Sequence, residues 1–418
     1  MSSFQIKMEY KRKIIFVTNY PIDKRDAKRF GFEILNDAGF KILIWDVSEF
    51  FYKNIEKINI DYYESNYVVT TKFYSLKEIK SETKKMEKHD VLIIAGTTIN
   101  IRSIKTFLLN KMFSKTHGYY TAITWGDHPI HVSEDKKNVF LANSIRLVRF
   151  IRRIFYKNYL ASVIWREFND STIIKYVINV TNLISPLETV WLATLGERIP
   201  KISIGKKTVL RFIHNLDYDL FLEMNNNNTS NQFRPVVILD SMGPLHPDYL
   251  AESRESTISL STYSKMINIF INKFEIETDK KIIIAAHPRS DLETIRKLYG
   301  DTDVFFHKTS EIVSQSSAVI SIDGSTAIGF AVMWRKPLII LNSNVFDSQS
   351  RKFNKLFSSL LGATEIDLDS DYSIPRIMGI DNDLYDDYQN KYIKRPGTPN
   401  NLFWKVVVED IKNGFKKT

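Results

Sequence analysis

The sequence predicts an α/β protein with two Rossmann-like domains, each built on a parallel β-sheet. Its 418 residues exceed what one ordinary hydrophobic core holds, so two domains are expected. The candidate strands are short and almost continuously apolar, which is typical of parallel strands covered on both faces. They alternate with helical segments, and this alternation restarts after a polar stretch near the middle of the chain.

The first half opens with a strand–helix–strand unit. We expect its two strands at residues 13–18 and 41–46. A polar loop at 19–26 leads from the first strand into a helix. Gly39 can end this helix, because glycine adopts left-handed backbone angles at no steric cost. The remaining apolar runs of this half predict strands at 90–95, 120–125, 173–178 and 201–205.

A linker is predicted at residues 224–232, where four consecutive asparagines and their polar neighbours cannot bury an apolar face. After it the pattern of strands and helices begins again. A helix at about 399–416 carries apolar residues at helical spacing. The second half is further expected to contain a helix at 261–276 and strands at 235–240, 281–286, 318–322 and 337–341.

These elements divide the chain into four parts. The predicted parts are an N-terminal domain (1–222), a linker (223–234), a C-terminal domain (235–398) and a terminal helix (399–418). For the terminal helix, packing back on the N-terminal domain is one option.

Composition and charge limit the classes of function. The chain has no cysteine, which excludes disulfides, thiolate catalysis and cysteine-ligated zinc and suits a reducing compartment. No run approaches the ~20 apolar residues of a membrane-spanning helix, and the first residues lack the apolar stretch of a signal peptide. We therefore expect a cytoplasmic protein. The net charge of +10 fits an anionic partner and, equally, an ordinary lysine-rich surface.

Two strands of the second half end in groups that suit a phosphate. The strand at 281–286 breaks at His287-Pro288-Arg289, where proline forces the chain out of regular structure. The strand at 318–322 breaks at Gly324-Ser325-Thr326, just before an apolar helix. Ligands of open α/β sheets bind beyond the carboxyl ends of the strands, so both breaks are placed to contact a nucleotide.

The residue types at these breaks support phosphate binding, although each has a plain structural alternative. A reference pKa near ~6.5 lets a phosphate hold His287 protonated. Arg289 adds a fork-shaped donor for a phosphate or a sugar carboxylate. Gly324 allows close approach, and the hydroxyls of Ser325 and Thr326 can donate at a helix start. The alternatives are a histidine bound to a loop carbonyl, a solvated arginine and an ordinary Ser/Thr N-cap.

From Val237 to Leu341 the chain resembles bacterial surface-polysaccharide biosynthesis proteins of the glycosyltransferase class. A His-Pro element followed by a Ser-Thr element is also similar to the signature of GT-B enzymes that use cytidine nucleotides. Those enzymes include bacterial sialyltransferases and polysialyltransferases, capsule Kdo transferases and CDP-glycerol polymerases. The matching segments are 238–240, 245–249, 284–291, 307–313, 324–332 and 336–340, within about a quarter of the chain.

The resemblance implies a GT-B fold, in which the two Rossmann-like domains face a cleft. In those families the His and the Ser/Thr contact the nucleotide phosphate, which implies this role for His287, Ser325 and Thr326. The C-terminal domain would then bind the nucleotide-sugar, and the N-terminal domain would be the acceptor side. No cofactor is implied, because the nucleotide-sugar is itself the substrate.

Other candidates for donor binding lie near the same sheet edge. Lys308, Thr309 and Ser310 follow another strand and could contact the base or ribose, or could simply cap a helix. Asp240 and His246 follow the first strand of the second half. His246 could reach the leaving group or sugar, with a structural turn histidine as the equal alternative.

Transfer to an acceptor hydroxyl needs a general base, and in a two-domain cleft we expect it in the N-terminal half. Asp23 and Asp26 follow the first strand, and Asp127 follows the strand at 120–125. Each of the three could instead be a solvated loop residue. The pair in Asp301-Thr302-Asp303 mimics a metal-binding Asp-x-Asp but lies at a predicted surface turn, so no metal site is predicted.

Residues 143–160 predict a basic amphipathic helix. Such a helix can lie on an anionic membrane, or can pack in a core with a solvated basic face. No sequence signature of a nucleic-acid-binding fold occurs, so nucleic acid is not an expected partner. The basic residues that share one helical face are Arg146, Arg149, Arg152, Arg153 and Lys157.

The sequence therefore favours a metal-independent glycosyltransferase of surface-polysaccharide biosynthesis. It would transfer a sugar from a nucleotide-activated donor, with a CMP-linked acidic sugar as one option, to a glycan or lipid-linked acceptor. His287 would act in catalysis by stabilising the departing phosphate. Two alternatives stay open: a nucleotide-sugar 2-epimerase, which needs carboxylates and a histidine from both domains, and a non-catalytic polysaccharide-assembly protein.

Overall fold

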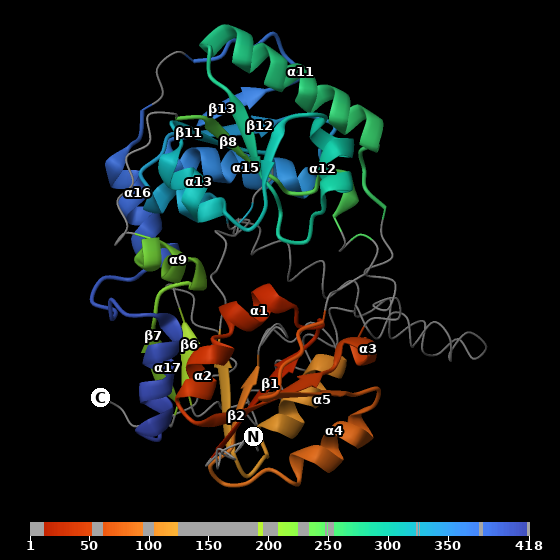
Figure 1. Cartoon of the computed structure of the whole chain (residues 1–418), viewed down its shortest axis with the longest axis vertical. Helices are drawn as coiled ribbons and strands as arrows, with labels where there is room; N and C mark the ends of the chain where they lie inside the picture. Colours follow the sequence, from red (N-terminus) through yellow and green to blue (C-terminus); the bar gives the residue numbers. More distant parts are fainter. Residues whose placement is uncertain are drawn as a thin grey trace, which may run out of the picture.

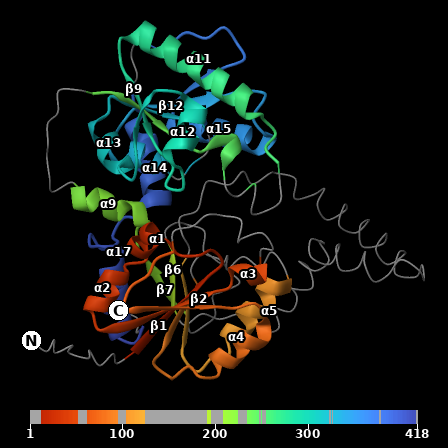
Figure 2. The ribbon, with the colours of Figure 1, turned by 45° about the vertical axis from the view of Figure 1, so that its right-hand side comes forward.

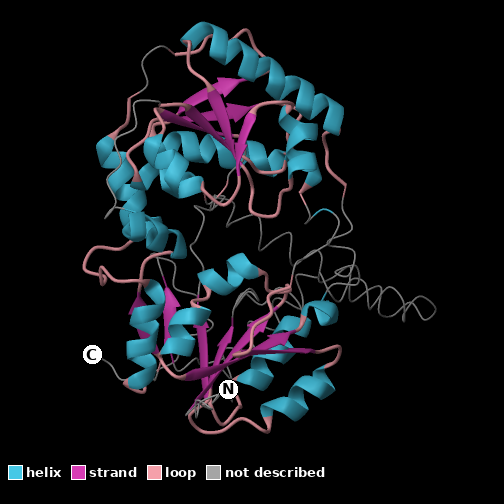
Figure 3. Cartoon of the chain, viewed as in Figure 1, coloured by secondary structure: helices cyan, strands magenta, loops and turns pink. Residues whose placement is uncertain are grey.

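The chain forms two β-sheets in a computed structural model, each covered by helices (Figure 3). Every strand pairing among the described residues is parallel. The predicted fold class, two Rossmann-like parallel sheets, is therefore confirmed. The structure describes residues 12–51, 62–94, 104–123, 191–194, 208–224, 234–246, 249, 255–322, 325, 327–375 and 379–415.

The first sheet has the order β3-β2-β1-β4-β5-β6-β7, in which the direction of winding reverses between β1 and β4. Its strands are β1 (Arg12–Thr18), β2 (Phe40–Asp46), β3 (Val68–Lys72), β4 (Val91–Ile94), β5 (Tyr119–Ile123), β6 (Trp191–Thr194) and β7 (Val209–Phe212). The helices of this half are α1 (Lys24–Arg29), α2 (Phe32–Asp37), α3 (Ser48–Phe51), α4 (Leu76–Thr83) and α5 (Ile104–Phe113).

The second sheet has the order β10-β9-β8-β11-β12-β13 and reverses between β8 and β11. Its strands are β8 (Val236–Leu239), β9 (Ile282–Ala285), β10 (Asp303–Phe305), β11 (Ala318–Ser321), β12 (Leu338–Asn342) and β13 (Thr364–Asp367). Its helices are η3 (Gly243–Leu245), α11 (Leu260–Thr278), α12 (Leu292–Tyr299), α13 (Thr309–Gln315), α14 (Ile328–Met333), α15 (Ser348–Leu361), α16 (Asn382–Tyr388) and η4 (Gln389–Ile393).

The apolar runs form strands because both faces of each sheet are buried. Along β1, Ile14 and Phe16 join one hydrophobic cluster, while Ile15 and Val17 join the cluster on the opposite face. Strand β8 divides its four residues between two clusters in the same way. A side chain buried on either face stabilises the fold by roughly 1.5–3 kcal/mol, which explains why no polar residue interrupts these runs.

Two helices tie the halves together. The C-terminal helix α17 (Phe403–Lys412) returns to the first sheet, where the Trp404 ring lies 5.5 Å from that of Phe16. In Figure 1 it lies beside α2. Helix α9 (Leu216–Met224) lies between the sheets and places Leu216 in the core of the first half and Tyr218 in that of the second (Figures 1 and 2).

Most predicted elements of the described segments are present, with small differences at their ends. Helix α11 extends the predicted 261–276 slightly at both ends, whereas α17 is shorter than the predicted 399–416. The sequence did not predict β3, β6, β7 and β13, whereas β10 corresponds to the strand expected before Lys308. The predicted strands at 173–178 and 201–205, most of the linker and the basic helix at 143–160 lie outside the described residues.

None of the helices in the described segments combines the length and the apolar character needed to cross a membrane.

Candidate functional site

The candidate site lies at the carboxyl ends of β8, β9 and β11, where the second sheet reverses its winding. Crevices at such reversal points are the usual ligand sites of open α/β sheets. Asp240 directly follows β8, His287 follows β9, and Ser325 lies after β11. Because all three strands are parallel neighbours, their following loops meet at one edge of the sheet.

Asp240 links two of these loops through three hydrogen bonds. Its Oδ1 accepts from the main-chain N–H of Met242 at 2.7 Å and from the hydroxyl of Tyr299 at 2.8 Å. Its Oδ2 accepts from the main-chain N–H of His287 at 2.9 Å. Burial raises the pKa of the Asp240 carboxyl, and these hydrogen bonds oppose that rise. The carboxyl thus fixes the position of the His287 backbone, while its predicted contact with a donor stays a prediction.

His287 is a neutral imidazole with a single N–H. Its Nδ1 accepts from the main-chain N–H of Arg289 at 3.2 Å, which leaves the single proton of the neutral ring on Nε2. Burial, together with the positive charges of His246, Arg289 and Arg25, lowers the pKa of His287 to about 3. That a phosphate holds this ring protonated stays a prediction; by itself the ring is a neutral Nε2–H donor.

A second histidine lies against His287. The rings of His246 and His287 meet edge to face, with their centroids 5.2 Å apart. His246 comes from the turn after β8, in which Met242 and Gly243 both have positive φ. A Cβ on Gly243 would lie 2.7 Å from the ring of Tyr263, so only glycine allows this turn to pack on α11.

The loop after β1 in the first half meets the loop after β9 in the second. The Arg289 guanidinium lies over the ring of Tyr20, 5.2 Å from its centroid. The charges of each half also act on the other half. Arg25 lowers the pKa of His287, and Arg289 lowers the pKa of Asp26. In Figures 1 and 2 helix α1, which carries Arg25 and Asp26, lies on the side of the first sheet that faces the second.

The two acidic candidates in this loop differ in what they do. Asp23 is the N-cap of α1, and its Oδ1 accepts from the main-chain N–H of Asp26 at 2.7 Å. Asp26 has a raised pKa, chiefly because of burial and then because of the Asp23 charge. A carboxyl that is desolvated at the boundary between two domains is a better candidate for a general base than a capping carboxyl. Asp127 lies outside the described residues.

The Ser-Thr element is described only in part. The Oγ of Ser325 accepts from the main-chain N–H of Ala327 at 3.2 Å, so this serine caps the turn that leads into α14. Its neighbours Gly324 and Thr326 lie outside the described residues. Helix α14 has six residues, which is less than two turns, so its macrodipole is small.

The group at the start of α13 is committed mainly to the fold. Ser310 is buried, and its Oγ accepts from the indole Nε1–H of Trp334 at 3.3 Å. Lys308 pairs with Glu311 at 3.8 Å on the surface. Thr309 is the first residue of the helix. Contacts of these three residues with a base or ribose remain predictions.

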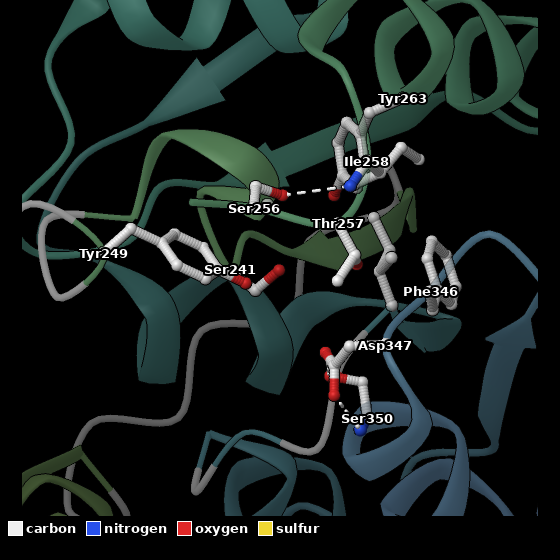
Figure 4. A pocket seen from close by; sticks show the side chains of 11 residues that line it. Ser241, Tyr249, Ser256, Thr257, Ile258, Tyr263, Phe346, Asp347 and Ser350 are labelled. Carbon is white, nitrogen blue, oxygen red and sulfur yellow. Dashed lines mark hydrogen bonds between the residues drawn. The ribbon is translucent and has the colours of Figure 1, made fainter. Parts of the chain in front are cut away.

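A pocket that the sequence did not predict lies beside the site (Figure 4). It has an empty volume of about 360 Å³, its open mouth included. Its walls come from the loop after β8, from Tyr249, residues 256–258 and Tyr263, and from the residues that follow β11 and begin α15. Because these segments are far apart in sequence, no local motif could have revealed the pocket. The polar side chains that line it are Ser241, Tyr249, Ser256, Thr257, Tyr263, Asp347 and Ser350.

The chemistry of the pocket suits an uncharged polar group. The Ser241 hydroxyl is buried without a hydrogen-bond partner among the described residues, a state that costs free energy unless a ligand or water satisfies it. The start of α15 is already occupied by the Asp347 carboxyl, which accepts from the N–H groups of Gln349 and Ser350 at 2.8 and 3.0 Å. A phosphate would therefore be repelled there, whereas a sugar or ribose ring finds hydroxyl partners.

Metal binding has no built site in the described segments. They hold no group of three or more His, Asp or Glu side chains placed to share an ion. Asp301, from the Asp-x-Asp pair, is fully exposed and bonds to Arg296 at 2.8 Å.

Comparisons with known proteins give similarity of the whole backbone only. No protein-family model and no curated protein matches the chain. MurG of Acinetobacter baumannii is similar over 96% of this chain and 99% of its own, with 8% identity and a TM-score of 0.43. The glycotransferase of kitacinnamycin matches 97% and 93% of the two chains, with 10% identity and a TM-score of 0.41. At these scores the similarity does not bear on what this chain binds or catalyses.

Proposed function

We propose that this chain is a glycosyltransferase that uses a nucleotide-activated sugar. The observation that carries the proposal is the meeting of the loop after β1 with the loop after β9, where Arg289 lies over the Tyr20 ring and its charge lowers the pKa of Asp26. A transferase of this kind needs a base for the acceptor hydroxyl and donors for the departing phosphate. Here the base candidate and the phosphate candidates come from opposite sheets, so a substrate bound between them would be contacted from both sides.

In the proposed mechanism each group has one role. The Asp26 carboxylate removes the proton of the acceptor hydroxyl as that oxygen attacks the anomeric carbon. The bond from this carbon to the phosphate oxygen breaks, and the Nε2–H of His287 and the Arg289 guanidinium stabilise the negative charge on the leaving nucleotide. The pocket beside Ser241 receives an uncharged, hydroxyl-bearing part of the donor. No cofactor or metal takes part in this scheme.

The finer assignments are proposals that rest on the sequence resemblance. The nucleotide would be a cytidine nucleotide, with a CMP-linked acidic sugar as one donor. The acceptor would be a glycan or a lipid-linked saccharide of surface-polysaccharide biosynthesis, such as capsule or lipopolysaccharide. The protein would act in the cytoplasm or at the inner face of the cell membrane, held there by the basic segment 143–160.

Thermal unfolding with CMP, CDP, UDP and GDP tests the nucleotide part of the proposal. A ligand that binds only the folded state raises Tm, and at equal concentration a tighter ligand raises it more. We expect CMP or CDP to raise Tm more than UDP or GDP. Equal shifts for all four nucleotides would refute the cytidine assignment, and no shift with any of them would refute nucleotide binding.

Vesicle co-sedimentation at two salt concentrations tests the membrane part. A polybasic segment gains about 1 kcal/mol per Lys or Arg near an anionic leaflet, and salt screens this gain. We expect binding to anionic vesicles at low salt and little binding to neutral ones. Charge reversal at Arg149 and Arg153 should abolish it without changing nucleotide affinity. No binding to anionic vesicles at low salt would leave the net charge of +10 as ordinary surface charge.

A nucleotide-sugar 2-epimerase is the second candidate, because the Asp26 carboxyl of the first half lies within reach of the charge of Arg289. The loop of the second half that holds Arg289 also carries His287, against which His246 lies. The two activities differ in their need for an acceptor. Incubation with UDP-GlcNAc alone should leave the sugar unchanged if the chain is a transferase. Epimerisation without any acceptor would decide for the second candidate, and neither reaction under any pairing would favour a non-catalytic assembly role.

A further inference from the structure

A buried histidine lies where the C-terminal segment crosses back from the second half to the first. His214 follows β7 and has no exposed surface. Its Nδ1 lies 2.8 Å from the main-chain oxygen of Asn215, and its Nε2 lies 2.8 Å from that of Asn401. The sequence contains no motif around this residue, and the proposed transfer reaction does not use it.

The two contacts require two protons on the ring. A main-chain carbonyl oxygen only accepts hydrogen bonds, and a neutral imidazole carries a single N–H. In a neutral His214 one nitrogen lone pair would therefore face an oxygen lone pair at 2.8 Å. A doubly protonated ring donates to both carbonyls, and this is the state that the geometry of both contacts favours.

A carboxyl is in place to balance the charge. Asp219 Oδ1 lies 3.5 Å from His214 Nε2 and accepts from the main-chain N–H of Phe403 at 2.9 Å. Burial raises the pKa of Asp219 to about 7, while burial lowers that of His214 against the pull of its two carbonyl partners. At 3.5 Å the charge of either group acts on the other, so the carboxylate of Asp219 favours the doubly protonated ring that the two carbonyl contacts call for.

Other charged groups of the described segments near His214 and Asp219 shift the pKa values of the two residues but do not donate to the carbonyl oxygens that the ring contacts. Lys394 lowers the pKa of His214, and Asp217 and Glu223 raise that of Asp219. Asp217 pairs with Arg29 at 3.6 Å, and Glu223 with Lys28 at 3.9 Å, both across to α1. On the other side of the ring lies Tyr218, whose ring centroid is 4.9 Å away.

The contacts of His214 and Asp219 fix the C-terminal segment where it passes from the second half to the first. Asn401 and Phe403 lie at the start of α17, which packs on the first sheet. One residue beyond His214, the main-chain N–H of Asn215 donates at 2.8 Å to the oxygen of Ile393, which is buried in the core of the second half. We term this set of contacts, from Asn215 and Ile393 to Asn401 and Phe403, the seam.

We propose that the His214–Asp219 pair holds one proton beyond the single N–H of a neutral ring, that this proton fixes the seam, and that losing it loosens the junction between the two halves. Deprotonation leaves one carbonyl without a donor and Asp219 as a partly buried anion beside a neutral ring. The change would act on the C-terminal segment and on α9, both of which join the halves. The seam is thus a pH-sensitive element in the joint of the molecule.

Hydrogen exchange of the full-length chain between pH 5.5 and 9 tests the proposal. After correction for intrinsic rates, the protection of the Phe403 amide, which donates to Asp219, should fall in one step within this range as the pair loses its proton. In Asp219→Asn the amide oxygen can still accept from Phe403, but the counter-charge is gone. The step should then move down by about one pH unit or more.

Glu223→Gln is the graded comparison, because it removes a neighbouring acid of the same helix that pairs with Lys28 and whose charge raises the pKa of Asp219. Its step should move down by less than that of Asp219→Asn. Protection that does not change with pH would overturn the proposal, as would a step of unchanged position in Asp219→Asn.

A second measurement on the wild type avoids any effect of mutation on folding. Nitrogen-15 NMR of histidine side chains distinguishes a doubly protonated ring from a single neutral tautomer. We expect both nitrogens of His214 to be protonated at pH 6. A neutral His214 at that pH would overturn the proposal.

Discussion

The carboxylate of Asp240 accepts a hydrogen bond from the main-chain N–H of His287 at 2.9 Å, so the end of β8 holds the first turn after β9. The same carboxylate bonds Met242 and Tyr299. One side chain therefore positions the His-Pro turn, the turn beside the pocket and the end of α12. We infer that Asp240 acts on a ligand through His287 rather than by direct contact.

Replacing Asp240 with alanine should destabilise the chain strongly. It would leave two main-chain N–H groups and a buried hydroxyl without acceptors, and each costs about 1–3 kcal/mol. We expect a loss of about 3 kcal/mol or more in urea unfolding. Asp301→Ala is the control, since Asp301 is fully exposed and should change stability by less than about 0.5 kcal/mol. Equal stability of the two variants would show that the Asp240 bonds contribute nothing.

His287→Ala should lower kcat by about a hundredfold or more while the protein stays folded, because it removes a donor to the leaving phosphate. His287→Gln keeps an N–H donor near the same place and should recover part of the loss. His117→Ala, which changes an exposed histidine of the first half, should have no effect. Wild-type turnover in a folded His287→Ala variant would remove His287 from the site.

The acidic side of the pH–rate profile should report Asp26. A general base works only when ionised, so kcat/KM should fall as the pH drops through the pKa of Asp26. Burial places that pKa above the ordinary value of ~3.9. Asp26→Asn should abolish turnover and, at the same time, leave the chain as stable as the wild type or more stable at pH 7.

The stability effect follows from the sign of the pKa shift. A carboxyl whose pKa is raised by folding makes its full stabilising contribution below its unfolded pKa. That contribution is lost as the pH rises through the folded pKa. At pH 7 the ionised Asp26 is therefore a cost that asparagine removes. Asp23→Ala should instead cost about 1 kcal/mol by removing the N-cap of α1. A destabilised Asp26→Asn with normal turnover would make Asp26 structural.

The fold was predictable wherever both faces of a strand are buried. The runs that form β1, β4, β8, β9, β11 and β12 are almost continuously apolar. Each predicted end of these strands lies within one residue of the observed end. Strand β3 was missed because four of its five residues are exposed at the edge of its sheet. Such a strand is defined by pairing with β2, and its own sequence carries no apolar pattern.

The candidate site was predictable only where it lies in one segment. His287 and Arg289 stand out in the sequence because they flank Pro288, directly after an apolar strand that the proline ends. Only folding brings together the residues that line the pocket and the three that bond to Asp240. The same is true of the contacts of His214 and Asp219 with Asn401 and Phe403. Arg25 was missed for the same reason, since its position opposite His287 depends on how the two halves meet.

Arg25 provides the sharpest test of that meeting. It is partly buried on α1, in the first half, yet its charge lowers the pKa of His287 in the second. If a nucleotide phosphate binds at His287, the guanidinium should contribute a charge-assisted interaction from across the boundary. Arg25→Gln should then raise the Kd for the bound nucleotide about tenfold.

The same substitution has a readout that needs no ligand. With one of three nearby cations removed, the pKa of His287 should rise above its value of about 3. Calorimetric titration gives the Kd, and NMR titration of the histidine ring gives the pKa. Lys24→Gln, an exposed neighbour on the same helix, is the matched control and should change neither. If Arg25→Gln also leaves both unchanged, the two halves do not meet at this site in solution, and a base in the first half could not serve a donor held by the second.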